Sequence, residues 1–123
     1  MATEQQQRDA AAFTQAQQLL SAGYQKQDSG DALGALDLFE QSKGCAQLIS
    51  VEATAKAIEL VALGSLGGVC NAMGQYQRAM EYSTRALTIS RGRNDKQNEG
   101  AALGNIGTAL MRLGQYTQAI THR

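Results

Sequence analysis

The side chains that could act as nucleophiles, bases or metal ligands are few and far apart in this sequence. The 123 residues include one histidine, His122, and two cysteines, Cys45 and Cys70. A nucleophilic site needs a serine or cysteine beside a base, and a zinc site needs a cluster of Cys and His ligands. A lone histidine next to Arg123 supports neither, so we expect a solvated helix residue there. The sequence predicts no enzyme, no metal and no other cofactor.

Two further patterns have structural explanations. Cys45 and Cys70 fall at apolar positions of helical patterns, which predicts small, buried thiols. The run 64–68, Gly-Ser-Leu-Gly-Gly, has the glycines of a phosphate-binding loop but lacks the Lys-Ser/Thr pair and a preceding strand. We expect it to lie inside a helix and to bind no phosphate.

Composition argues against several classes of partner. Eleven basic and eleven acidic residues give a formal net charge of zero, whereas nonspecific nucleic-acid binding depends on a basic surplus. No apolar stretch approaches the roughly 20 residues of a membrane span, and the polar N-terminus lacks the layout of a signal peptide. We expect a cytosolic or nuclear chain, with cytoplasmic as the prediction, that binds neither nucleic acid nor membrane.

Basic residues nevertheless gather around one predicted helix end: Arg85, Arg91, Arg93 and Lys96. Cations are favoured near a helix C-terminus by the helix dipole. Asp95 and Glu99 offset part of the charge. The pattern favours a solvated loop over a nucleic-acid patch.

The sequence repeats itself with a period of 40 residues. Residues 62–82 (ALGSLGGVCNAMGQYQRAMEY) align without a gap with residues 102–122 (ALGNIGTALMRLGQYTQAITH). Residues 30–40 form a weaker copy, offset by 44 residues from the copy that begins at Gly74. Apolar residues within each copy recur at helical spacing, and strand alternation is absent from the pattern. The sequence therefore predicts an array of helical repeats.

Capping signals and glycines divide the chain into helices. Thr3 with Gln6, and Asn94 with Gln97, match the capping box of a polar N-cap followed by Glu or Gln. Glycines mark the ends of helices, among them Gly114. We predict helices at 4–27, 31–47, 52–73, 76–91, 95–113 and 115–123. They form one domain over residues 1–123, with helix pairs at approximately 4–47, 52–91 and 95–123, the last incomplete.

Small and aromatic residues recur at matching places in successive units. A glycine inside a helix costs about 1 kcal/mol relative to alanine, which is tolerable where a neighbouring helix approaches closely. A tyrosine that begins the second helix can lay its ring against the preceding turn. Six positions are predicted to set the packing within pairs: Gly67, Gly107, Ala79, Ala119, Tyr76 and Tyr116.

These residues resemble the tetratricopeptide repeat family. The usual unit of that family is about 34 residues, and units of 40 that contain Ala-Leu-Gly-Asn, as at 102–105, resemble its Leu-Gly-Asn or Pins-type subgroup. The resemblance implies an all-α, right-handed superhelical array of antiparallel helix pairs, with about three repeats. It also implies a noncatalytic scaffold or adaptor that binds a peptide segment of a partner protein in a concave groove.

The first helix of each pair would line that groove. Polar side chains there could pair with the backbone of a bound segment, and a methionine would offer an adaptable apolar contact. The resemblance places these residues in the groove: Ser65, Gly68, Asn71, Asn105, Thr108, Met111 and Arg112.

Two other functions stay open. Repeat arrays need a terminal cap with a polar outer face, and the last predicted first helix would leave Leu110 and Leu113 partly uncovered. The chain would then self-associate through its uncapped C-terminal end, or pack within a longer repeat protein of which it is a fragment. We accordingly expect that Arg123 is not the natural end of the array. A regulatory domain of an enzyme is the third reading.

Overall fold

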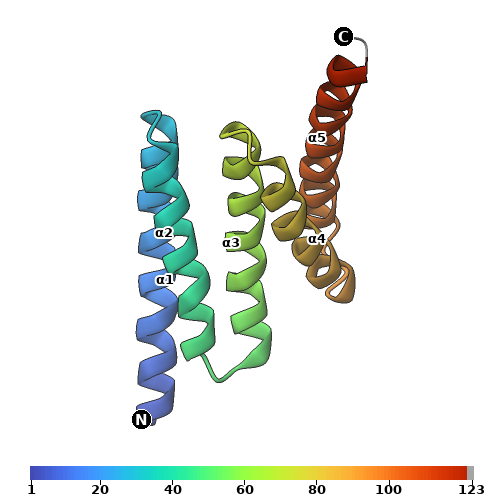
Figure 1. Ribbon diagram of the computed structural model, residues 1–123. Helices are drawn as coiled ribbons and strands as arrows, with labels where there is room; N and C mark the ends of the chain where they lie inside the picture. Colours follow the sequence, from blue (N-terminus) through green and yellow to red (C-terminus); the bar gives the residue numbers. More distant parts are fainter. Residues whose placement is uncertain (122–123) are drawn as a thin grey trace.

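The computed structural model describes the backbone of residues 1–121 and the side chains of residues 1–115. In this part of the chain all regular structure is helical, which confirms the all-α prediction. The elements are α1 (Glu4–Asp28), α2 (Ala32–Cys45), the short 3-10 helix η1 (Ala46–Leu48), α3 (Glu52–Ala72), α4 (Tyr76–Gly92) and α5 (Lys96–Thr121). Successive helices run antiparallel and lie side by side, with α3 at the centre (Figure 1).

Local signals account for most helix ends. Thr3 accepts a hydrogen bond from the backbone N–H of Gln6, whose side chain bonds back to Thr3, so the predicted capping box is formed. Gly30 and Gly74 adopt positive φ values of 87° and 76°, as expected for residues that end a helix. The predicted cap at Asn94 is wrong by one residue. Asn94 is a left-handed turn residue with φ 55°, and Asp95 accepts the N–H of Asn98.

The predicted break at Gly114 is also wrong, because α5 continues through it to Thr121. The corresponding turn at Gly74 is held by α4, which buries four small side chains along its length. A helix over 115–121 would have only about two turns, and short helices gain too little from packing to repay the loss of continuous backbone hydrogen bonds. The third unit is therefore a single helix in the described part of the chain.

The core is centred on α3. Leu63, Leu66, Val69 and Cys70 are completely buried, and Phe39 of α2 packs against Leu66 and Val69. Both thiols are buried and unpaired as predicted, and burial raises the pKa of Cys45 and of Cys70. The glycine run 64–68 lies within α3, so it is a helical segment and no phosphate loop.

One described helix is long and apolar enough to cross a membrane, contrary to the sequence expectation. It is α3, with 21 residues and a mean hydropathy of 1.3 in its most apolar window. A central core helix of a water-soluble protein has the same length and composition. Because α3 packs against α2, α4 and α5, this finding is weak evidence for a membrane span.

The helices form two layers. The first helices of successive units contact one another, α1 with α3 and α3 with α5. The second helices α2 and α4 meet through side chains, where Tyr82 of α4 donates a hydrogen bond to Glu40 of α2. The predicted binding residues all belong to the layer of first helices.

Candidate functional site

Two of the predicted groove residues are joined directly. The Asn71 amide in α3 donates a 2.9 Å hydrogen bond to the backbone carbonyl of Asn105 in α5. The Asn105 amide donates in turn to the carbonyl of Gly64, at 3.2 Å. These bonds tie α3 to α5, so both amide nitrogens are engaged inside the protein rather than held ready for a bound backbone.

The junction of α3, α4 and α5 is polar. The Asn71 Oδ1 atom and the Ser83 Oγ atom are buried, and neither makes a hydrogen bond with another described residue. A Cβ on Gly67 would overlap Ser83 Oγ and would lie 3.1 Å from Asn105 Nδ2. Because residue 67 is glycine, the Ser83 hydroxyl and the Asn105 amide can occupy the space that a side chain there would fill. Ala79 lies fully buried at the same junction, with its carbonyl 3.6 Å from that Cβ position.

The same contact occurs one unit earlier, at a place that sequence analysis missed. Gly23 of α1 is buried against the Phe39 ring, and a Cβ there would overlap the ring. Gly23 precedes Gly67 by 44 residues and Phe39 precedes Ser83 by 44, the offset of the weak first copy. Extending that copy back beyond Gly30 would have found this pair.

In the third unit the contact is not formed. No described atom lies within 4 Å of a Cβ built on Gly107, because α5 runs on past Gly114 and brings no second helix back over it. The predicted partners Tyr116 and Ala119 have side chains outside the described residues, and so does His122. Tyr76 is partly buried beside Ala79, and its hydroxyl lies 3.9 Å from a Cβ on Gly74, which places the ring against the preceding turn.

The remaining predicted groove residues are at least partly accessible. Ser65 shares a 2.8 Å hydrogen bond with the exposed Tyr24, which joins α3 to α1. Thr108 donates to the carbonyl of Gly104 one turn earlier. Met111 is exposed, and Arg112 donates to Gln115 at 3.4 Å.

Two features of this surface were not predicted. Tyr24 is the first: it precedes Gly68 by 44 residues and so belongs to the same repeat position. The second is the exposed helix backbone at Gly64 and Gly104, where, as at the predicted groove residue Gly68, a Cβ would meet no described atom within 4 Å.

The described part of the chain holds no cluster of metal-ligating side chains. Within residues whose side chains are described, no three His, Cys, Asp or Glu side chains come together as ligands.

Antiparallel helix pairs that recur with a fixed period and meet at matching small residues define a helical-repeat protein. The sequence model of the Tetratricopeptide repeat family matches residues 58–122, more than half of the chain. The chain belongs to the tetratricopeptide repeat family. No curated protein and no solved structure matched it.

Proposed function

We propose that this chain is a noncatalytic scaffold or adaptor that binds a peptide segment of a partner protein along α1, α3 and α5. Membership of the tetratricopeptide repeat family supports a role in protein–protein interaction. The main support for placing the binding site there is the layer that the first helices α1, α3 and α5 form together. A hydrogen bond between Tyr24 and Ser65, and one from the Asn71 amide to the Asn105 carbonyl, hold these three helices side by side.

Exposed glycines support this choice of surface. Where a helix lacks side chains, a bound segment can approach its backbone closely. Gly64 and Gly68 offer such an approach on α3, and Gly104 offers it on α5. On the same layer of helices, the exposed Tyr24 of α1 and Met111 of α5 supply apolar contact, and Arg112 of α5 supplies a cation. The segment that fits carries apolar side chains and an acidic group.

The test uses variants that block the surface without loosening the fold. Replacing Asn71 or Asn105 would disrupt the α3–α5 contact, so Gly68→Arg is the better probe. Gly44→Arg in α2 is its matched control, because a Cβ at either glycine meets no described atom within 4 Å. Partner proteins captured from lysate by the wild type and Gly44→Arg, and lost with Gly68→Arg, support the proposal. Equal capture by all three contradicts it.

One observation favours a second function, self-association or packing within a longer repeat protein. Leu103 and Leu110 of α5 are 45% and 53% exposed, whereas their counterparts Leu63 and Cys70 in α3 are fully buried. A second copy, or a following helix of the same array, would cover these side chains. Sedimentation over a range of concentrations separates the two functions, because a tight oligomer that dissociates in Leu110→Glu is expected only if this end self-associates.

A further inference from the structure

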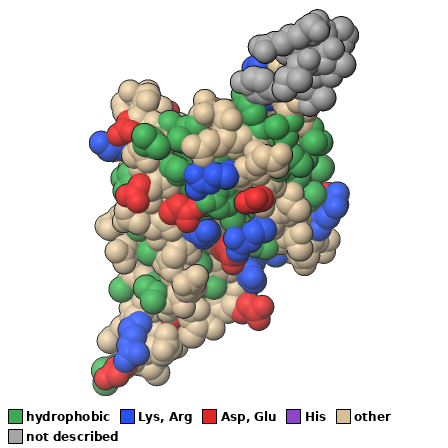
Figure 2. Space-filling view, in the orientation of Figure 1, with side chains coloured by type: hydrophobic (Ala, Val, Ile, Leu, Met, Phe, Trp, Pro, Cys, Tyr) green, Lys and Arg blue, Asp and Glu red, His purple; other side chains and the backbone are tan. Residues whose placement is uncertain are grey.

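A second surface lies where the end of α2 and the middle of α4 meet the first half of α3, at residues other than the predicted groove residues. Figure 2 shows Lys and Arg side chains gathered near the centre of the face that these helices present, with Asp and Glu side chains among them. A hollow of about 270 Å³ lies among them, between the end of α2, the first half of α3 and the middle of α4. Neither the peptide proposal nor the family match accounts for it.

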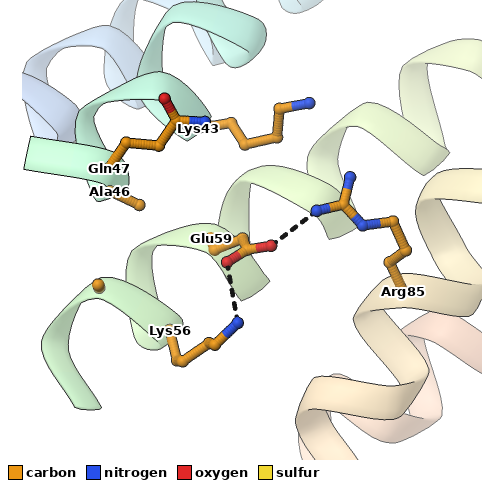
Figure 3. Close-up of a pocket in the computed structure, with 7 residues that line it drawn as sticks. Lys43, Ala46, Gln47, Lys56, Glu59 and Arg85 are labelled. Atoms are coloured by element: carbon orange, nitrogen blue, oxygen red, sulfur yellow. Dashed lines mark hydrogen bonds and ion pairs between the residues drawn. The ribbon is translucent and has the colours of Figure 1, made fainter. Parts of the chain in front are cut away.

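The hollow collects positive charge from three helices. Its lining includes the cations Lys43, Lys56 and Arg85, and a single carboxylate, Glu59. Lys43 and Arg85 reach toward it from opposite sides, and Glu59 lies between Lys56 and Arg85 (Figure 3). With Glu59 and the Glu40 that pairs with Lys43 both counted, the cations still outnumber the carboxylates by three to two, so the local field favours a negatively charged ligand.

Glu59 pairs with only some of the N–H donors that these cations offer. Glu59 accepts from Arg85 at 2.9 Å and from Lys56 at 3.5 Å. Arg85 makes no other hydrogen bond among the described residues, although its guanidinium has several further N–H donors. Lys43 pairs with Glu40 at 3.1 Å outside the lining, and Gln47 adds a side-chain amide at the edge of the hollow.

We propose that this hollow binds an oxyanion, the phosphoryl or carboxylate group of an acidic or phosphorylated side chain on a partner protein. Arg85 presents the planar fork that pairs with two oxygens of such a group, while the two lysines act as point charges on either side. The volume admits one such group and a few water molecules, at about 30 Å³ of liquid volume for each water. None of its lining residues belongs to the predicted groove residues on α3 and α5.

The test titrates the 123-residue chain with inorganic phosphate and, separately, with acetate, at constant ionic strength. Backbone amide signals in two-dimensional NMR report where each anion binds. The probe variant is Arg85→Gln, and its matched control is Arg91→Gln, because the two arginine side chains are 56% and 59% exposed and each pairs with a glutamate.

The expected result is a saturable shift of signals from residues 43–47 and 56–59, with a Kd raised about tenfold in Arg85→Gln and unchanged in Arg91→Gln. Saturation by phosphate alone assigns a phosphoryl ligand, and equal saturation by acetate assigns a carboxylate. If the amide signals saturate with neither anion, or if both variants raise the Kd equally, the proposed oxyanion site is wrong. If Arg85→Gln loses helicity, Lys43→Gln replaces it, because Lys43 makes no contact with Glu59.

Discussion

The side-chain amide of Asn71 donates a 2.9 Å hydrogen bond to the backbone carbonyl of Asn105. The Asn105 amide donates to the Gly64 carbonyl, so one pair of asparagines joins α3 to α5 twice. Two residues that the family resemblance places in a ligand groove therefore also hold together the helices that form the surface.

Replacing Asn71 by alanine is expected to destabilise the chain by about 1 kcal/mol, because an interhelical hydrogen bond is lost. Urea unfolding followed by circular dichroism measures this change. Thr108→Ala is the control, since its hydroxyl bonds only within α5, and it should stay within about 0.5 kcal/mol of the wild type. Equal stability of Asn71→Ala and the wild type contradicts the structural role of this bond.

Adjacent glycines of α3 should respond oppositely to alanine. Gly67→Ala places a methyl group against Ser83 and Asn105, and overpacking of this kind typically costs about 1–3 kcal/mol. Gly68→Ala meets no described atom within 4 Å and should gain up to about 1 kcal/mol from helix propensity. Thermal unfolding of both variants measures the difference.

A double variant identifies the cause at Gly67. In Gly67→Ala/Ser83→Ala the clash with the hydroxyl oxygen is removed, so part of the stability should return. Failure to regain any stability would mean that Ser83 is not the group that excludes a side chain at 67.

Repeat-equivalent leucines should differ in their cost of truncation. Leu63→Ala empties a fully buried position and is expected to cost about 2–5 kcal/mol. Leu103→Ala changes a half-exposed side chain and should cost less than about 1 kcal/mol. Chemical unfolding at low protein concentration measures both. A cost at Leu103 that rises with protein concentration would show that another copy covers this face.

Below about pH 4, stability should fall partly through one contact between α1 and the segment that precedes α3. Hydrogen bonds from the side chain and the backbone N–H of Ser50 hold the pKa of Asp9 below its usual value. Because the folded-state pKa is the lower one, this contribution is complete above the unfolded-state value of about 3.9 and is lost as the pH falls through the folded-state value.

Ser50→Ala removes the shorter of these two bonds, so its unfolding free energy should depend less steeply on pH below about 4 than that of the wild type. Ser29→Ala is the control, because the Ser29 hydroxyl donates to the carbonyl of Lys26 and touches no carboxylate. Parallel pH profiles for Ser50→Ala and the wild type would contradict the assignment.

The repeat pattern predicted the helices well where the local signals and the packing agree. The Thr3 capping box and the turn at Gly74 are formed, and α3 and α4 begin where they were predicted to begin. At Gly114 the same glycine signal failed, because a turn also needs a second helix long enough to pack on the first. A glycine signal in the sequence gives no information on whether such a second helix is present.

The packing around the candidate site was predicted only in part. The 40-residue alignment placed Gly67 correctly at a helix crossing, whereas the weaker copy at 30–40, with its 44-residue offset, was not extended back to Gly23 and Tyr24. The hydrogen bonds of Asn71 could not be predicted, because they depend on the distance between two helices rather than on spacing along one. The cations of the oxyanion site come from three helices and form no motif in the sequence.

The most direct test of the central proposal, peptide binding along the first helices, is the affinity of the wild type, Gly68→Arg and Gly44→Arg for a segment of a captured partner. Fluorescence anisotropy of the labelled segment measures it, after equal helicity of the three proteins is established. We predict that Gly68→Arg weakens binding by about tenfold or more, as blocking a central contact does, while Gly44→Arg binds like the wild type. Equal affinities for all three proteins would contradict binding at this surface.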